Sequence, residues 1–389
     1  MTSRDASAIG GAGRGIRIRA PKTQEIGAES APFVTAIAFP TPISCVFRNE
    51  QRNNSANASR DARTTLGGMT WLVTGGAGYI GAHVVRALQD AGLTAIVLDD
   101  LSSGHASFVA PETPFIRASI LDGERVLDAL GQHGVTGVIH VAGFKYAGVS
   151  VQRPLHTYEQ NVTGTAVLLA AMQDRGVDRI VFSSSAAVYG TPDVDLVTED
   201  TPKNPQSPYG ESKLIGEWLL RDQGVAAGLR HTSLRYFNVV GSGHPSLPDT
   251  SPHNLFPLVF DALVAGRTPK INGDDYPTPD GTNVRDYIHV SDLAAAHVAA
   301  ARRLDAGEPL ESAYNLGSGD GVSVGEIMAT VAEVTGIPFV PEIAPRRAGD
   351  PARIVAAGDL AARDLDWTMR HGLREMVSSA WDARRAAEG

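Results

Sequence analysis

Tyr209 and Lys213 are the residues whose types and spacing most clearly suggest catalysis. If the segment 209–213 is helical, the four-residue spacing places the phenol and the ammonium on the same face. A neighbouring cation stabilises a phenolate, so it lowers the tyrosine pKa and makes the side chain a usable base. Ser185 ends an apolar run and would lie at the end of a strand. A Tyr-x-x-x-Lys pair alone is usually a solvated helix face, but this serine and a glycine-rich loop favour a catalytic site.

That glycine-rich loop is Thr74-Gly75-Gly76-Ala77-Gly78-Tyr79-Ile80-Gly81. Gly75 would permit a tight turn, Gly78 would let backbone N–H groups approach a pyrophosphate, and Gly81 would let a helix pack close to its strand. The next apolar run ends at Asp99. A carboxylate there accepts hydrogen bonds from ribose hydroxyls and repels a 2′-phosphate. The sequence therefore predicts a dinucleotide site that prefers NAD over NADP.

Short apolar runs that alternate with helical patterns would position these residues. The predicted strands are Trp71–Thr74, Ala95–Leu98, Gly137–Val141, Arg179–Ser183 and Thr232–Tyr236, and predicted helices include Ile80–Ala91, Glu124–Leu130 and Val162–Gln173. This alternation predicts an α/β fold with a doubly wound parallel sheet. After about Gly243, loops rich in proline and glycine predict a smaller α/β substrate domain. We therefore expect an NAD-binding domain over residues 69–244 and a mainly substrate-binding domain over 245–389.

Composition narrows the class of partner. The 389 residues carry 34 basic and 43 acidic side chains, a net charge of −9, which disfavours binding to nucleic acid or an anionic membrane. The single cysteine, Cys45, excludes an intramolecular disulfide and a cysteine metal cluster, and it favours the cytoplasm. We predict no metal site.

Residues 1–68 differ from the rest, with nine basic and five acidic side chains. They contain no uninterrupted apolar stretch of membrane-spanning length. We expect them to be a disordered extension or an upstream misreading, with the native start at Met69. A transit peptide is the alternative.

The motifs, in this order, resemble the extended short-chain dehydrogenase/reductase family from Met69 to near Trp381. Besides 74–81 and 209–213, the matching segments are Asp99–Gly104, Ala142–Lys145, Ser183–Gly190, Arg235–Asn238, Asp275–Thr278, Val284–His289 and Ala344–Asp350. Within the family the resemblance is to enzymes that act on UDP-sugars. It implies NAD-dependent epimerisation of UDP-glucose and UDP-galactose at the sugar 4-position, through a transient 4-keto intermediate.

The resemblance also implies a role for each residue that matches a motif. Tyr209 would take the proton of the sugar 4-hydroxyl, Ser185 would hydrogen-bond the reacting oxygen, and Lys213 would tune Tyr209 and hold the nicotinamide ribose. The implied cofactor contacts are Gly75, Gly78, Tyr79, Ile80, Gly81, Asp99, Asp100, Leu101, Ser102, Ser103, Gly104, Ser119, Ile120, Val141, Ala142, Gly143, Lys145, Asn161, Tyr209, Lys213 and Phe237. The implied UDP-sugar contacts are Ser185, Tyr209, Asn238, Asn254, Leu255, Arg285, Arg347 and Asp350. Helices containing Val162–Gln173 and Ser212–Leu220 would pair in a homodimer.

Several of these residues have structural alternatives. Arg285 and Arg347 could be surface salt-bridge partners, and Asn238 and Asn254 could be turn residues. His289, in an apolar strand-like run, is more simply explained as a structural histidine than as a catalyst.

Four positions bear on specificity. Ser119 stands where the family usually has an aspartate that reads adenine, Asn272 where an aromatic residue often packs near uracil, and Ala187 where threonine is common. Ile354, or Arg353 if one residue is deleted, would line the pocket at the sugar 2-position. A branched isoleucine there predicts efficient turnover of UDP-galactose and weak turnover of UDP-N-acetylgalactosamine.

Two other functions remain possible from the sequence. A sugar 4,6-dehydratase or decarboxylase shares the fold, but a dehydratase needs extra acid and base groups after the catalytic serine. Here that stretch, Ala186-Ala187-Val188, has no carboxylate. A non-catalytic nucleotide-binding regulator would be expected to lack Tyr209 or Lys213, and both are present.

Overall fold

The structure is a computed structural model that describes residues 69–347 and 350–387. The expectations for residues 1–68 lie outside this part of the chain. The described residues belong to one compact unit.

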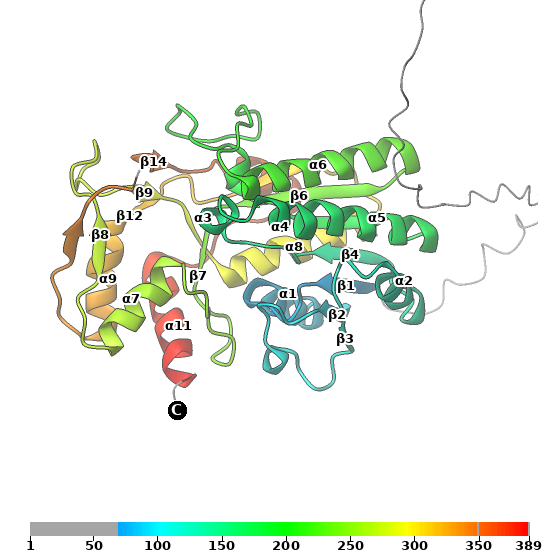
Figure 1. Ribbon diagram of the computed structural model, residues 1–389, viewed down its shortest axis with the longest axis horizontal. Coiled ribbons are helices and arrows are strands. Elements are labelled where there is room, and N and C mark those ends of the chain that lie inside the picture. Colours follow the sequence, from blue (N-terminus) through cyan, green and yellow to red (C-terminus); the bar gives the residue numbers. More distant parts are fainter. Residues whose placement is uncertain (1–68, 348–349, 388–389) are drawn as a thin grey trace, which may run out of the picture. The chain divides into compact units, whose positions relative to one another are not determined.

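A parallel sheet of seven strands forms the centre (Figure 1). Its strand order is β11-β6-β5-β4-β1-β2-β3. The strands are β1 (Thr70–Thr74), β2 (Thr94–Asp99), β3 (Phe115–Arg117), β4 (Gly137–His140), β5 (Arg179–Ser183), β6 (Arg230–Tyr236) and β11 (Ala313–Leu316). All five predicted strands are present, whereas β3 and β11 were not predicted. The predicted fold class is confirmed.

Helices cover both faces of this sheet because successive strand residues point to opposite faces. Trp71 and Val73 of β1 belong to the core beneath α1 (Tyr79–Asp90) and α8 (Val290–Asp305). Leu72, between them, belongs to the core on the other face. That face is covered by α2 (Gly123–Gln132), α5 (Gly164–Arg175) and α6 (Pro208–Ala227).

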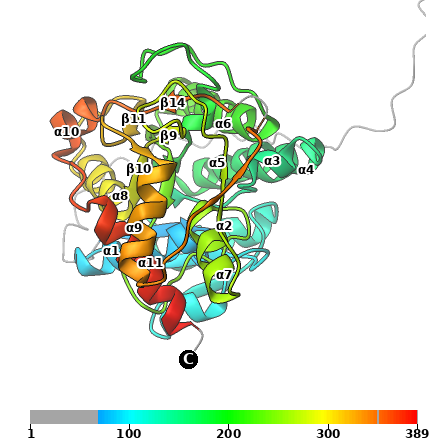
Figure 2. The ribbon, with the colours of Figure 1, turned by 90° about the vertical axis from the view of Figure 1, so that its left-hand side faces the viewer.

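A second group of elements lies at one end of the sheet (Figures 1 and 2). Its helices α7 (Leu255–Val264), α9 (Val324–Thr335) and α11 (Leu373–Ala386) share a core that includes Phe260, Ile327 and Val377. Its short strands are β7 (Asn238–Val240) with β10 (Tyr287–His289), β8 (Lys270–Asn272) with β13 (Glu342–Ala344), and β9 (Val284–Arg285) with β12 (Val322–Ser323) and β14 (Arg353–Ile354). Since α8 and β11 belong to the central sheet layers, the expected 245–389 domain also contributes to them, and the division at 244/245 stays a prediction.

Short elements make the remaining turns. They are η1 (Ala106–Phe108), α3 (Ala147–Ser150), α4 (Pro154–Tyr158), the π-helical η2 (Glu159–Thr163), η3 (Ala186–Val188) and α10 (Asp359–Leu365). Among the described residues, no helix has the length and apolar character needed to cross a membrane.

Candidate active site

The turn from β1 into α1 brings backbone N–H groups to the carboxyl edge of the sheet. Gly75 has φ +73°, and a Cβ there would lie 2.7 Å from the backbone nitrogen of Ala142. A Cβ on Gly81 would lie 2.1 Å from the carbonyl oxygen of Gly75, so neither position accepts a side chain. Helix α1 starts at Tyr79 with no acidic residue in its first turn. Its N-terminus therefore offers positive potential for a pyrophosphate.

Asp99 ends the neighbouring strand β2 beside this turn. Its carboxylate accepts hydrogen bonds from the backbone nitrogens of Ala77 (3.0 Å) and Leu101 (2.8 Å). The side chain is buried, and burial raises its pKa. Each carboxylate oxygen holds one protein donor and keeps acceptor capacity for a ribose hydroxyl.

Tyr209 and Lys213 lie on the first turns of α6. Ser207 caps this helix by accepting a hydrogen bond from the backbone nitrogen of Gly210 (3.2 Å), and Pro208 occupies the first turn. The Nζ of buried Lys213 donates to the carbonyl oxygen of Ser183 (2.8 Å) and lies 5.9 Å from the centre of the Tyr209 ring.

Ser185 follows strand β5 and hydrogen-bonds the Tyr209 hydroxyl. The three residues predicted to be catalytic therefore meet at the carboxyl edge of the sheet.

The pKa values of Tyr209 and Lys213 differ from what the Tyr-Lys spacing alone predicts. Burial raises the pKa of Tyr209, and the hydrogen bond with Ser185 opposes that rise. Burial lowers the pKa of Lys213 to about 8, while the negative charge of Glu217 opposes the fall. In the protein alone, desolvation of the phenol thus outweighs the lowering of the Tyr209 pKa that the Tyr-Lys spacing predicts.

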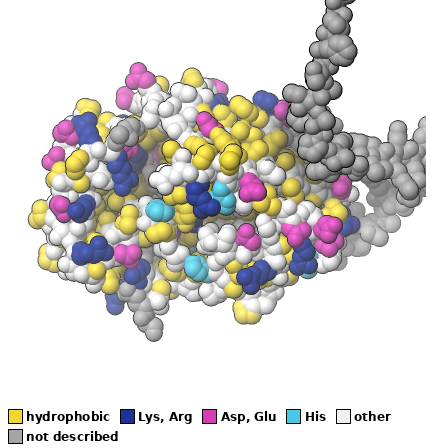
Figure 3. Space-filling view, viewed as in Figure 1, with side chains coloured by type: hydrophobic (Ala, Val, Ile, Leu, Met, Phe, Trp, Pro, Cys, Tyr) yellow, Lys and Arg dark blue, Asp and Glu magenta, His cyan; other side chains and the backbone are white. Residues whose placement is uncertain are grey.

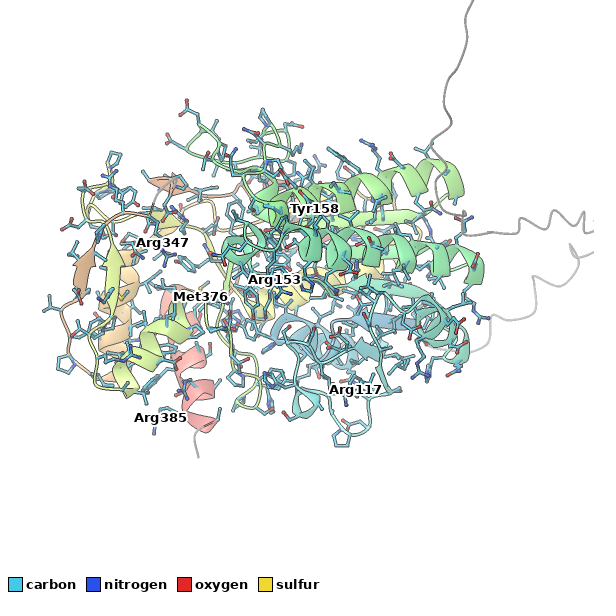
Figure 4. All side chains as sticks on the ribbon, viewed as in Figure 1. Arg117, Arg153, Tyr158, Arg347, Met376 and Arg385 are labelled. Atoms are coloured by element: carbon cyan, nitrogen blue, oxygen red, sulfur yellow. The ribbon has the colours of Figure 1, made fainter. Side chains whose placement is uncertain are left out.

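A cavity of about 1000 Å³ lies along this edge. One side is formed by the glycine turn, Asp99, and the loops after β2 and β4. The opposite side is formed by the start of α7, strands β8 and β9, and Arg347 with Asp350. Figure 4 shows Arg153 and Arg347, both of which line the cavity, on different groups of elements. Figure 3 shows basic and histidine side chains around this part of the surface.

The far end of the cavity carries two arginines. Arg285 forms an ion pair with Asp350, which also accepts from Asn283 Nδ2 (3.0 Å). Its side chain is 12% exposed, so Arg285 is a cavity residue and not a surface salt-bridge partner. Arg347 can donate to the Asn272 amide oxygen at 3.2 and 3.3 Å. Two guanidinium groups here suit a diphosphate in charge and geometry.

The sequence profile of the NAD-dependent epimerase/dehydratase family matches residues 71–317. The protein belongs to this family. UDP-glucose 4-epimerase from Corynebacterium glutamicum is 42% identical over 316 residues, which cover 80% of this chain and 95% of that enzyme.

Solved structures in the family are similar over most of their length. UDP-glucose 4-epimerase from Stenotrophomonas maltophila, with bound NAD and formylated UDP-arabinopyranose, is 40% identical with a TM-score of 0.78, over 82% of this chain and 99% of that one. UDP-glucose 4-epimerase from Brucella ovis, in complex with NAD, is 39% identical with a TM-score of 0.78, over 80% of this chain and 97% of that one.

Most residues implied by the family resemblance line the cavity. They are Gly75, Gly78, Tyr79, Ile80, Gly81, Asp99, Asp100, Ser102, Ser103, Ile120, Val141, Ala142, Gly143, Lys145, Tyr209, Lys213, Phe237, Asn238, Asn254, Leu255, Arg285, Arg347 and Asp350. Asn238 and Asn254 also make protein hydrogen bonds, to the carbonyl oxygen of Asp286 (3.0 Å) and to the carboxylate of Asp249 (2.7 Å). The position of each agrees with a turn role and with a contact role.

Five of the implied residues lie outside the lining: Leu101, Gly104, Ser119, Asn161 and Ser185. Asn161 is buried, and its amide bonds the backbone nitrogen and oxygen of Phe144 (2.6 and 3.0 Å) and the Ser212 hydroxyl (2.8 Å). It therefore fixes the loop after β4, and direct contact between Asn161 and a cofactor stays a prediction. The Ser119 hydroxyl accepts from the backbone nitrogen of Leu121 (3.2 Å).

Two further predictions concern residues of the second group. His289 caps α8 by accepting from the backbone nitrogen of Ser291 (3.0 Å), and it contacts Ser379 Oγ (3.0 Å), so its structural role is confirmed. Ile354 packs in a buried cluster with Val188 and is absent from the cavity lining. A wall role for Ile354 would have to act through Phe237, which packs against that cluster and lines the cavity.

Tyr146 and His253 also line the cavity, and sequence reasoning missed both. Their rings meet in a T-shaped contact with centroids 4.8 Å apart, and Tyr146 also hydrogen-bonds Ser251. No motif identifies such a pair because the two segments meet only in the folded chain. The aromatic residue directly after Lys145 was the one available signal.

Proposed function

We propose that the protein is an NAD-dependent UDP-glucose 4-epimerase that interconverts UDP-glucose and UDP-galactose. The observation that carries this proposal is the position of Tyr209. It lies beside Lys213 and Ser185, in one cavity with the glycine turn and Asp99 at one side and with Arg285 at the other. Such a cavity can hold a dinucleotide and a nucleoside diphosphate sugar with the sugar at Tyr209.

The residues present fit NAD. The glycine turn excludes side chains, the N-terminus of α1 supplies free N–H groups for the pyrophosphate, and Asp99 suits ribose hydroxyls. Lys213 would hold the nicotinamide ribose. When bound, NAD supplies a hydride acceptor for the sugar 4-carbon and later returns the hydride, so the reaction has no net redox change.

The chain's own residues would move the proton and hold the substrate. Tyr209 takes the proton of the 4-hydroxyl and gives it back after the sugar has turned. Ser185, although it lies outside the cavity lining, would hydrogen-bond the same oxygen once the sugar is bound. Arg285 and Arg347 hold the diphosphate during this turn.

The stretch after Ser185 supports epimerisation over dehydration. Ala186–Val188 forms η3, and Ala186 and Val188 are buried. A dehydratase must remove a proton from carbon 5 and protonate the leaving 6-hydroxyl, and this stretch provides no carboxylate for either step.

We also propose that the protein is a homodimer. Helices α3, α4 and α6 pack against one another. On them Leu155 (83%), Trp218 (47%) and Val225 (88%) are exposed, as is Val151 (62%) directly after α3. Figure 3 shows hydrophobic side chains gathered over this region. Such a face suits a second copy. It includes the predicted pairing helix α6, whereas α5, the other predicted helix, contributes none of these exposed side chains. A monomer by light scattering would contradict this assembly.

The single cysteine supports a cytoplasmic location.

The direct test resolves products. The purified protein is incubated with UDP-galactose and, separately, with UDP-N-acetylgalactosamine. We expect UDP-glucose from the first and little turnover of the second. A 4-keto-6-deoxy product would assign the protein to the dehydratases.

A further inference from the structure

Glu217 is a buried carboxylate that the proposed proton transfer does not use. It lies on α6, one helical turn beyond Lys213, with its side chain 10% exposed. We infer that Glu217, paired with Arg235, is a positioning residue that holds the Ser183–Ser185 strand end and sets the electrostatic field at Lys213. This inference rests on the proposed function.

The contacts of Glu217 lead directly to the catalytic residues. Its Oε1 accepts from Ser184 Oγ (2.6 Å) and Arg235 Nε (2.9 Å), and its Oε2 accepts from Arg235 Nη2 (2.6 Å). Ser184 lies between two residues that contact the catalytic pair. The carbonyl oxygen of Ser183 accepts a hydrogen bond from Lys213 Nζ, and Ser185 hydrogen-bonds Tyr209. One carboxylate therefore connects the strand end to the helix that carries Tyr209 and Lys213.

Arg235 anchors this connection in the sheet. Its side chain is 5% exposed, and its Nη1 donates to the Tyr189 hydroxyl (2.7 Å), which donates to Asn315 Oδ1 (2.7 Å) on β11. A buried ion pair usually stabilises a fold no better than well-packed apolar residues would. The position of the Glu217–Arg235 ion pair next to the catalytic residues is therefore better explained by its effect on their geometry and charge.

Besides its hydrogen bonds, Glu217 affects Lys213 through its negative charge. The titratable groups around the two residues are Tyr209 on α6, His140 on β4, Arg235, Tyr236 and His231 on β6, and Lys203 in the loop before α6. Burial holds the pKa of His140 at about 3, so this neighbour is neutral at pH 7. Glu217 is the negative charge that opposes the burial-driven fall in the Lys213 pKa.

Two single substitutions should move the alkaline limb of the kcat profile in opposite directions. Glu217→Gln leaves the Arg235 cation unpaired, so Lys213 should lose its proton at a lower pH and the limb should shift down by about half a pH unit or more. Arg235→Gln leaves Glu217 as an uncompensated anion, so the limb should shift up. A merely structural pair would lower activity and thermal stability in both variants without opposite shifts.

Two more variants cover a failure of either single variant to fold. The double variant Glu217→Gln/Arg235→Gln leaves no unpaired buried charge, and its limb should lie between those of the single variants. Ser184→Ala keeps the ion pair, so kcat should fall about 3- to 10-fold while the limb stays in place. An unchanged kcat in Ser184→Ala would refute the positioning role.

Limbs that coincide with that of the parent in every folded charge variant would refute the electrostatic role. Retention of NAD and of the melting temperature identifies the variants that qualify for comparison. The parent enzyme separates this inference from the proposed function. If the parent does not epimerise UDP-galactose, the proposed function fails, whereas an active parent with no opposite shifts refutes this inference alone.

Discussion

Opposing influences act on the hydroxyl of Tyr209. Burial favours the neutral phenol and raises its pKa, whereas the hydrogen bond with Ser185 favours the phenolate. The charge of Lys213, with Nζ 5.9 Å from the ring centre, adds to the second effect when the lysine is protonated. The identity of this base could be predicted from residue type and spacing. Its environment could not, because the groups that desolvate it come from several distant segments.

Replacing Tyr209 with phenylalanine tests the base at the residue scale. The ring still fills its buried site, so the fold and UDP-sugar binding should persist while kcat falls about 100-fold or more. Tyr158→Phe is the matched control, since that hydroxyl bonds Glu211 and lies outside the cavity lining. Equal activity in Tyr209→Phe would remove this residue from the mechanism.

Among the elements, strands β1, β2, β4 and β5 could be predicted because each is a short buried run with β-branched residues. Strand β6 has only Thr232 of that type and could be predicted from its buried run Thr232–Tyr236. Strand β3 was missed because it is three residues long. Strand β11 was missed because Ala313–Leu316 lies far along the chain and gains its place only by pairing with β6. In the site, too, only features encoded in local sequence could be predicted. The cofactor-binding half lies on local motifs, whereas the Tyr146–His253 contact and the Glu217–Arg235 pair depend on tertiary packing.

The Tyr146–His253 contact predicts a change in substrate binding. His253 directly precedes Asn254 and the start of α7, so the contact connects the proposed substrate segment to the loop after β4. Tyr146→Ala should raise KM for UDP-galactose about 3- to 10-fold with kcat nearly unchanged, the usual worth of an aromatic pair. Tyr146→Phe keeps the ring and should restore most of the affinity. A fall in kcat at constant KM would show that the contact serves chemistry instead.

At the scale of the whole molecule, buried histidines make the fold sensitive to acid. Burial lowers the pKa of His297 to about 4 and that of His140 to about 3, below the ordinary value of 6.5. The unfolded chain therefore takes up protons first as the pH falls. The stability contributed by these neutral side chains is complete above pH 6.5 and is lost as the pH falls toward 4, by on the order of a few kcal/mol for each histidine.

Melting temperatures measured between pH 7.5 and 4.5 check this dependence. Burial raises the pKa values of Asp99 and Asp286, so these two residues make the fold more stable as the pH falls. The contribution of a histidine is therefore measured by comparing a variant with the parent protein. His297→Gln should lower the melting temperature at pH 7.5, because the hydrogen bond to Ser183 is lost. On acidification the melting temperature of this variant should fall less than that of the parent protein. His133→Gln, at an exposed site, should leave the slope unchanged. An unaltered slope in His297→Gln would rule out His297 as a source of the acid sensitivity.

We propose that hydride leaves carbon 4 of the sugar and returns to it inside one cavity, while Tyr209 takes up and returns the proton. The most direct measurement uses UDP-galactose carrying deuterium at carbon 4, incubated with the holoenzyme in ordinary water. We expect UDP-glucose that retains the deuterium at carbon 4, with no added cofactor consumed. Loss of the label to solvent, or a labelled product that has also lost water, would contradict it.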